Sequence, residues 1–330
     1  MKKIIQQAFF QLRNQPLLSV ITVLGTALAI ALIMVILIVY QAKTADYAPE
    51  VNRSRSLYVK WERTVYDKKD PNSAGHSRPS LWLVKEIFYP LTTPEAVTAT
   101  YEGGEVLVGT VGSDEEMNTP LMLTDAAFWK VYQFRFLAGK PFTEADFQSG
   151  MKQAVIAKSV ARRLFGGAEN AIGKDILVNF AAYTVCGVVD DVNRFCEFTW
   201  SEVYAPYTSN AIASEAEAGQ TSGNNVITIL ARSTDDFDAI RNEVARGVAQ
   251  INTTLGDMEL QLMGQPDNFR MQLNRKFANQ YENLNANFWK YGIMILIILL
   301  VPAINLSGLT NTRMRRRLEE LGIRKAFGAT

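Results

Sequence analysis

Residues 17–40, LLSVITVLGTALAIALIMVILIVY, form an apolar stretch without a charged side chain, and residues 288–309, FWKYGIMILIILLVPAINLSGL, form a second apolar stretch. Each is long enough to cross about 30 Å of hydrocarbon as a helix, since about 20 residues suffice. Residues 41–287 between them are mostly polar. The sequence therefore predicts a membrane protein in which two transmembrane helices bracket one large domain.

The basic residues on the outer-sequence flanks predict the topology. Lys2, Lys3 and Arg13 precede the first span, and a longer basic run follows the second: Arg313, Arg315, Arg316, Arg317, Arg324 and Lys325. Because Lys and Arg concentrate in short cytoplasmic segments, we expect both ends of the chain in the cytoplasm. Residues 41–287 would then be periplasmic or extracellular, outside the inner (plasma) membrane. A cleaved signal peptide is the alternative for residues 17–40, but the stretch exceeds a signal peptide's apolar core of about 7–15 residues.

The net charge of +1 conceals basic ends around a mildly acidic middle. An acidic exterior argues against a nucleic-acid partner, which would require a basic face. The two terminal segments, residues 1–16 and 310–330, are expected to be cytoplasmic. Ile5, Phe9 and Leu12 share one helical face, so we expect residues 1–16 to lie along the inner membrane surface.

An apolar stripe precedes the second span, with steps of three or four residues. Its members are Phe269, Leu273, Phe277, Tyr281, Leu284 and Phe288. The spacing predicts one long helix that begins near Asp267 or Asn268, both suitable N-caps, and runs as a stalk over residues 268–287 into the membrane. The alternative is a helix packed on its own domain.

Residues 41–267 are expected to form an α+β domain of two lobes, one about 52–112 with 225–263 and the other about 113–208. Apolar and β-branched runs predict strands at 56–61, 105–111, 153–156, 175–178, 183–189 and 225–230. Helical spacing predicts helices at 80–89, 125–132, 159–165 and 235–250. The polar residues 209–225 are expected to form a loop.

Residues with catalytic chemistry are scarce, and we expect no enzyme activity, cofactor or metal site. The single histidine, His76, has no second histidine with which to share a metal or a triad and is expected in a surface loop. Residues 166–175, GGAENAIGKD, have the wrong spacing for a phosphate loop, and Asp175 stands where Ser or Thr is required. Cys186 and Cys196 leave two alternatives open, a disulfide in an oxidising compartment or free buried thiols.

Residues 315–329, RRRLEELGIRKAFGA, resemble the cytoplasmic motif that follows the second membrane helix of MacB/FtsX-type ABC transporter permeases. Residues 134–144, FRFLAGKPFTE, and 183–192, YTVCGVVDDV, look like parts of the extracytoplasmic domain of that family. The resemblance follows the whole chain in order. The family has a third membrane helix after this motif, whereas the chain ends at Thr330, so we expect further membrane helices beyond it.

The resemblance implies a permease subunit that carries out no catalysis and that transmits ATP-driven movement to its outer domain for export or extraction of a substrate. It implies a separate ABC ATPase subunit, a permease homodimer or heterodimer, contact with membrane lipid and, as a further candidate partner, a periplasmic adaptor protein. Together with the charge pattern, it assigns the ATPase contact to Glu319, Glu320, Gly322, Arg324 and Lys325.

Two other functions share the predicted topology. A two-span sensor is one, although its exit helix should continue as apolar heptads, and Gly322 and Gly328 interrupt such a pattern. An FtsX-like regulator that recruits a cell-wall hydrolase is the other.

Overall fold

The computed structural model describes residues 16–112, 115–278, 289, 292–300, 314, 318–319, 321–323 and 325–328. The chain divides into two compact units, Met1–Ala42 with Asn283–Thr330, and Lys43–Glu282. The predicted segment 1–16 lies outside the described residues except for Pro16, as does most of the predicted second span.

The helix α2, Pro16–Thr44, contains the first apolar stretch. Pro16 is its first residue, a position where proline costs no helical hydrogen bond. Most of its apolar side chains are exposed, Leu28 and Leu37 among them. Among the residues that the structure describes, one helix, Val23–Thr44, is long and apolar enough to cross a membrane. Of the second predicted span, the described residues 292–300 are helical.

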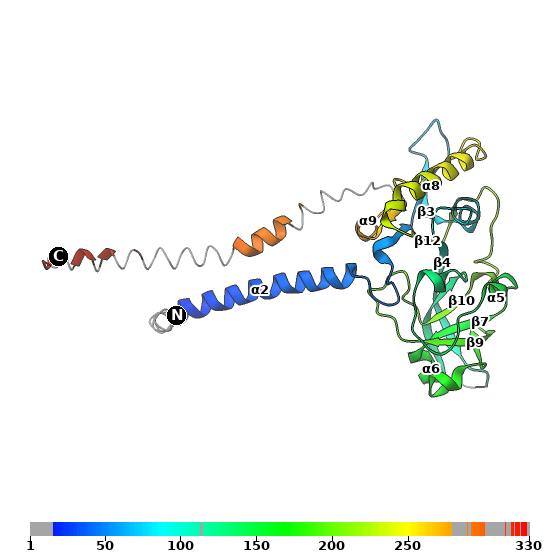
Figure 1. Ribbon diagram of the computed structural model, residues 1–330, viewed down its shortest axis with the longest axis horizontal. Helices are drawn as coiled ribbons and strands as arrows, with labels where there is room; N and C mark the ends of the chain where they lie inside the picture. The colour runs from blue at the N-terminus through cyan, green and yellow to red at the C-terminus, as the bar shows by residue number, and fades with distance from the viewer. Residues whose placement is uncertain are drawn as a thin grey trace. The chain divides into compact units, whose positions relative to one another are not determined.

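The unit Lys43–Glu282 is built on a ten-stranded sheet in the order β14-β1-β12-β4-β5-β10-β7-β9-β6, with β8 paired to both β4 and β9. Its strands are β1 Ser56–Val59, β4 Ala96–Gly109, β5 Glu116–Thr124, β6 Phe136–Gly139, β7 Gln153–Ala157, β8 Asp175–Val178, β9 Ala181–Val189, β10 Val203–Pro206, β12 Asn225–Leu230 and β14 Asp267–Asn268. Because β8 bridges β4 and β9, the strands β4, β5, β10, β7, β9 and β8 close a ring. Figure 1 shows β7, β9 and β10 at one part of this sheet.

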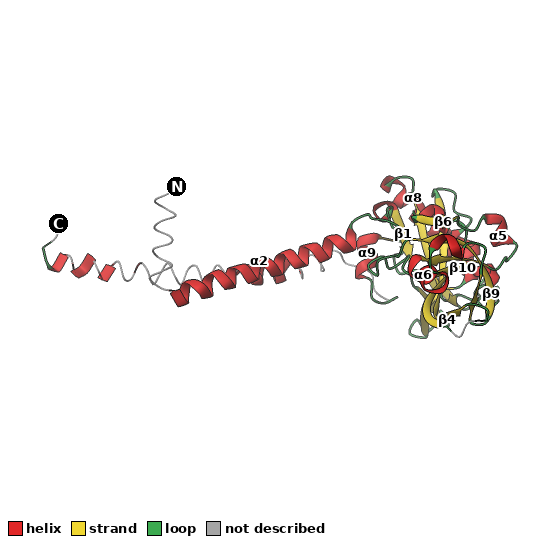
Figure 2. Cartoon of the chain, turned by 90° about the horizontal axis from the view of Figure 1, so that it is seen from below, coloured by secondary structure: helices red, strands yellow, loops and turns green. Residues whose placement is uncertain are grey.

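A smaller four-stranded sheet has the order β11-β3-β2-β13. Its strands are β2 Glu62–Val65, β3 Ala74–Pro79, β11 Ser222–Gly223 and β13 Glu259–Gln261. Helices lie around the strands (Figure 2). They are α3 Leu81–Leu83, α4 Phe128–Val131, α5 Glu144–Gln148, α6 Lys158–Phe165, α7 Ala168–Ala171, α8 Phe237–Asn252 and α9 Phe269–Asn274, with the 3-10 turns η1 Arg53–Arg55, η3 Tyr207–Ser209 and η4 Thr234–Asp236 and the π-helical turn η2 Val84–Phe88.

The mixed α and β content agrees with the sequence prediction, and the strands predicted at 175–178 and 225–230 have the observed bounds. The two predicted lobes share β4. Residues Ala96–Tyr101 of β4 pair with β12. Residues Thr100–Gly109 of β4 pair with β5, and this pairing contains a bulge between Glu102 and Gly104. One buried core runs through the unit from Leu57 on β1 to Val189 on β9.

Candidate functional site

The chain enters and leaves the unit Lys43–Glu282 on neighbouring strands. β1 and β14 are antiparallel, with Leu57 opposite Asn268 and Tyr58 opposite Asp267. The start of β1 and the end of β14 therefore lie at the same end of this pair. We call the residues around it the junction: 45–53 before β1, 193–200 in a loop, and 267–278 from β14 onward.

A buried ion pair organises the first side of the junction. The Arg53 Nε lies 2.7 Å from Glu50 Oε2, and both side chains are fully buried. The guanidinium also donates to the carbonyl oxygens of Ala45 at 2.8 Å and Phe195 at 3.2 Å. The other carboxylate oxygen of Glu50 accepts hydrogen bonds from the Phe198 amide at 3.0 Å and the Thr199 hydroxyl at 2.9 Å. Arg53 thus ties the residues after α2 to the loop 193–200.

Aromatic rings enclose this pair. The Arg53 guanidinium lies 4.2 Å from the ring centroid of Tyr47 and 4.9 Å from that of Phe269, both within cation–π range. Tyr58 on β1 stacks on Phe198 at 4.3 Å and packs against Phe269 at 5.6 Å. These contacts connect β1, the loop 193–200 and the start of α9.

A second buried ion pair holds the exit side. Arg275 donates from Nε to Asp267 Oδ2 and from Nη2 to Oδ1 at 2.9 Å, and both side chains are 1 % exposed. The same guanidinium donates to the Met263 carbonyl at 3.2 Å. α9 ends at Asn274, and Arg275 takes an extended conformation with φ −72° and ψ 108°. Arg275 is therefore paired with Asp267 on β14 at the position where α9 ends.

Burial raises the pKa of Glu50 and of Asp267, while the neighbouring arginines Arg53 and Arg275 offset part of that rise. A buried charge is costly unless it is paired and hydrogen-bonded, and removing one partner leaves an uncompensated charge. The Arg53–Glu50 pair satisfies that condition through several additional hydrogen bonds. The Arg275–Asp267 pair satisfies it through its two-point contact and the bond to the Met263 carbonyl. The junction is therefore built to hold three chain segments in one fixed arrangement.

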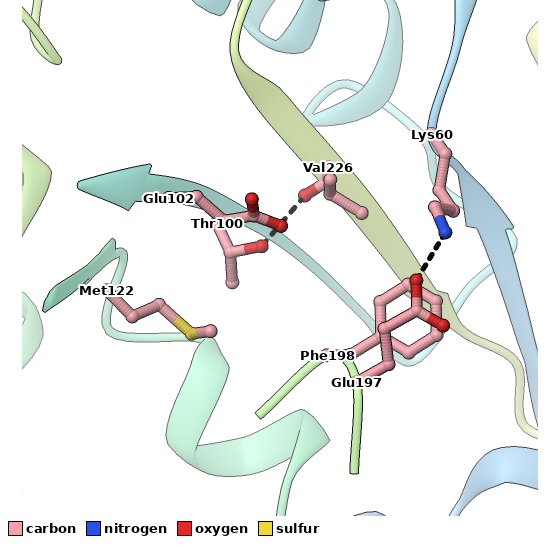
Figure 3. A pocket seen from close by; sticks show the side chains of 7 residues that line it. All are labelled: Lys60, Thr100, Glu102, Met122, Glu197, Phe198 and Val226. Atoms are coloured by element: carbon pink, nitrogen blue, oxygen red, sulfur yellow. Dashed lines mark hydrogen bonds and ion pairs between the residues drawn. The ribbon is translucent and has the colours of Figure 1, made fainter. Parts of the chain in front are cut away.

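Two hollows lie apart from the Arg53–Glu50 and Arg275–Asp267 pairs. One of about 10 Å³ is closed on one side by the Lys60–Glu197 ion pair (Figure 3), and its volume is close to that of a single water. It is lined by Lys60, Thr100, Glu102, Met122, Glu197, Phe198 and Val226. The other, of about 420 Å³, is open and apolar, with Trp129 and Phe142 among its walls. Neither brings together a nucleophile and a base, and no cluster of metal ligands occurs among the described residues.

The structure changes the predicted stalk. Asn268 caps α9 by accepting a hydrogen bond from the Met271 amide at 3.0 Å, as the sequence predicts. The prediction of one unbroken helix from there is wrong, since α9 ends at Asn274. Phe269 is a buried core residue, Leu273 is half-buried, and Phe277 is 61 % exposed. Tyr281 and Leu284 lie outside the described residues.

The other predicted site residues are placed as follows. Glu319, Gly322 and Lys325 lie on exposed helical segments, whereas Glu320 and Arg324 lie outside the described residues. Cys186, on β9, and Cys196, in the loop 193–200, are both free thiols, so the disulfide alternative is not realised.

His76 is exposed, as expected, but lies on the strand β3 opposite Arg63 rather than in a loop. The sequence analysis did not identify Glu50, Arg53 or Arg275, and it named Asp267 only as a candidate helix N-cap. The one sequence signal for a pair was that Glu50 and Arg53 have opposite charges three residues apart, which is also ordinary for surface residues.

Comparison with known proteins gives a family match. The model of the MacB-like periplasmic core domain matches residues 19–246. The macrolide export ATP-binding/permease protein MacB of Wolinella succinogenes is 25% identical over 332 residues, which cover 98% of this chain and 47% of that protein. The ABC transporter permease YknZ of Bacillus subtilis is 22% identical over 317 residues, covering 94% of this chain and 74% of that protein. The chain thus spans about half the length of this MacB relative.

Among solved structures, the extracellular domain of the ABC-type transporter YknZ from Gram-positive bacteria is similar, with a TM-score of 0.44 and 19% identity. The match covers 62% of this chain and 99% of that domain.

Proposed function

The chain belongs to the family of MacB-like ABC transporter permeases, and from this membership we propose that it is the membrane subunit through which a separate ABC ATPase drives export or extraction of a substrate. The observation that carries the proposal is the family match over residues 19–246, which runs from α2 into α8.

We assign the ATPase contact to the segment after the second span. Its proposed residues are Glu319, Glu320, Gly322, Arg324 and Lys325. Charges of both signs can pair with a partner protein, and a glycine permits close approach of the backbone. The proposal includes cytoplasmic chain ends, residues 41–287 outside the membrane, and assembly as a homodimer or heterodimer, with a periplasmic adaptor as a further partner.

We assign transmission of movement to the junction and the segment after it. The stalk residues of this proposal are Phe269, Leu273, Phe277, Tyr281 and Leu284. Because α9 ends at Asn274, the mechanical link is a short helix clamped by the Arg275–Asp267 pair, followed by the segment that leads to the second span. Movement of either span would reach the sheet through Arg53 or Arg275.

The test uses the full-length permease and a purified ABC ATPase that is its candidate partner, reconstituted in nanodiscs. Glu320→Lys and, separately, Arg324→Glu are compared with the wild type and with Lys69→Glu, which reverses an exposed charge in the turn between β2 and β3. Desolvated interface charges typically cost 2–5 kcal/mol when one partner is lost, so we expect ATPase affinity to fall at least tenfold in the first two variants and not in the third.

If both Glu320→Lys and Arg324→Glu bound the ATPase with wild-type affinity, the proposed contact site would be contradicted. Failure of the wild-type permease itself to bind this ATPase or to stimulate its ATP hydrolysis would contradict the permease function.

A further inference from the structure

The open apolar hollow of about 420 Å³ lies between α4 and the segment that follows β6. Its lining consists of Ala126, Ala127, Trp129 and Lys130 on the α4 side and residues 140–144 on the other side. The volume falls within the range of about 300–1,000 Å³ that small-molecule sites occupy. Nine residues line the hollow, whereas a stable protein interface takes about 20–30 residues from each side. These dimensions favour a small molecule over a protein partner.

The walls of this hollow are held by contacts within the domain itself. Asp125 Oδ1 accepts a hydrogen bond from the first amide of α4 at 3.0 Å, which fixes the start of that helix. The Trp129 ring packs edge-to-face against Phe142, with 5.4 Å between the ring centroids. On the other side, the Thr143 amide donates to Asp146 Oδ2 at 2.8 Å, in the capping box that begins α5. The hollow is therefore preformed, as small-molecule sites usually are.

The charges that line the hollow leave one ammonium group available to a ligand. Lys130 donates from Nζ to the Glu95 carbonyl at 3.1 Å, and Glu144 accepts a hydrogen bond from Gln148 at 2.7 Å. Lys140 is exposed, and its ammonium group makes no hydrogen bond or ion pair with any residue that the structure describes. The lining thus has two ammonium groups against one carboxylate. This balance favours a negatively charged ligand over a positively charged one.

The apolar part of the lining determines the rest of the ligand's chemistry. The half-buried Trp129 ring, Pro141 and the apolar stem of Lys140 offer surface to an apolar body. A carboxylate is a strong acceptor for an ammonium group, because a hydrogen bond between two ionised groups is stronger than one between neutral groups. Since the hollow is open, the charged end of such a ligand would keep its contact with water while the apolar body covers Trp129.

We propose that this hollow binds a small organic anion, which has an aromatic or branched apolar body and a single carboxylate. The body packs on Trp129, and the carboxylate pairs with Lys140. The proposal goes beyond the permease function and does not rest on it, because every residue that it uses lies within 126–144. Neither the membrane topology nor the ATPase contact enters the argument.

The test uses the full chain in phospholipid nanodiscs and the photoreactive probe 4-benzoylbenzoate, which has two aromatic rings and one carboxylate. Irradiation attaches the probe where it is bound, and mass spectrometry of peptides locates the labelled residues. The matched neutral probe is 4-benzoylbenzamide, which has the same rings and no charge. Labelling at Phe180, on the turn between β8 and β9, measures unspecific reaction with apolar surface, because Phe180 is 77 % exposed.

Three variants separate the charge of the site from its shape. Lys140→Gln removes the proposed partner of the carboxylate and keeps most of the side-chain stem. Lys174→Gln is the matched control, because Lys174 is also exposed and lies outside the hollow. Ala127→Leu fills the hollow from the α4 side. Circular dichroism checks that each variant is folded, and the surface variant Lys140→Gln decides the test if Ala127→Leu does not fold.

We expect 4-benzoylbenzoate to label residues 126–144 saturably and several-fold more than Phe180. The amide probe and Lys140→Gln should each lower this labelling several-fold, Ala127→Leu should abolish it, and Lys174→Gln should leave it unchanged. Labelling of residues 126–144 that does not saturate, or that does not exceed labelling at Phe180, would overturn the site. Equal labelling by the two probes, or wild-type labelling of Lys140→Gln, would overturn the anionic ligand.

Discussion

Arg53 is among the largest side chains that the domain buries completely, although it stands in a polar stretch between α2 and β1. Nothing in residues 45–53 distinguishes it from a surface residue, because its burial depends on Phe195, Phe198 and Phe269, which are distant in the sequence. The same holds for Asp267 and Arg275. Charge partners that come together only through tertiary packing cannot be read from spacing, so the sequence analysis missed the candidate site.

Replacing Arg53 by Met should destabilise the domain by about 3–5 kcal/mol, because Glu50 would remain buried without its partner. Arg53→Met combined with Glu50→Gln should recover part of the loss, since glutamine removes the orphan charge and keeps an acceptor for Phe198 and Thr199. Urea unfolding of residues 43–282 measures both. A single variant as stable as the wild type would show that the pair contributes nothing net.

The pH dependence of that variant has a definite sign. Burial raises the pKa of Glu50 above its usual 4.5, and loss of Arg53 raises it further. A carboxyl group whose pKa is higher in the folded state loses stability as pH rises from its unfolded pKa through its folded pKa. The deficit of Arg53→Met should therefore shrink as pH falls from 7 toward about 4.5. A constant deficit would exclude an orphan charge as its cause.

At the scale of elements, the sequence predicted the strands and helices whose local residue pattern matches the structure that they form in the folded domain. β8 and β12 are apolar runs bounded by turns and were predicted with their observed bounds. β5 and β10 were missed because each contains a proline, Pro120 and Pro206, which usually argues against a strand. The predicted stalk failed where a buried ion pair, Arg275–Asp267, overrides helical spacing.

The pairing of β6 with β9 depends on a glycine. Gly139 has φ +65°, and a Cβ there would lie 2.2 Å from the Cys186 carbonyl oxygen. Gly166, at the end of α6, has a similar φ of +75° but open space around it. Gly166→Ala should cost only the backbone strain of about 1–2 kcal/mol, and Gly139→Ala clearly more. Equal unfolding midpoints for the two variants would contradict the close approach.

At the scale of the whole domain, the two lobes expected from the sequence are continuous. β4 is paired with β12 on one side and helps to close the strand ring on the other, so its residues belong to both halves. Sequence patterns indicate which segments are strands, whereas which strand is shared depends on long-range register. That part of the fold was not predictable from local pattern.

Residues 43–282 should therefore fold alone and unfold in one cooperative transition. Circular dichroism reports the strands and helices, and tryptophan fluorescence reports Trp61 and Trp82 before β4 and Trp129 and Trp200 after it. The two signals should give the same urea midpoint. Two separated transitions would show that the lobes are independent despite the shared strand.

The antiparallel β1–β14 pair has a mechanical consequence for the proposed topology, in which a membrane span precedes and follows the domain. Its described register joins only Leu57 with Asn268 and Tyr58 with Asp267. Spans that moved in concert would place no tension across this ladder. Spans that separated laterally would unzip it one bond at a time, with the Arg53 and Arg275 ion pairs as the remaining resistance. The closed ring of strands begins at β4 and does not include β1 or β14. The β1–β14 pairing would therefore break before the ring of strands deforms.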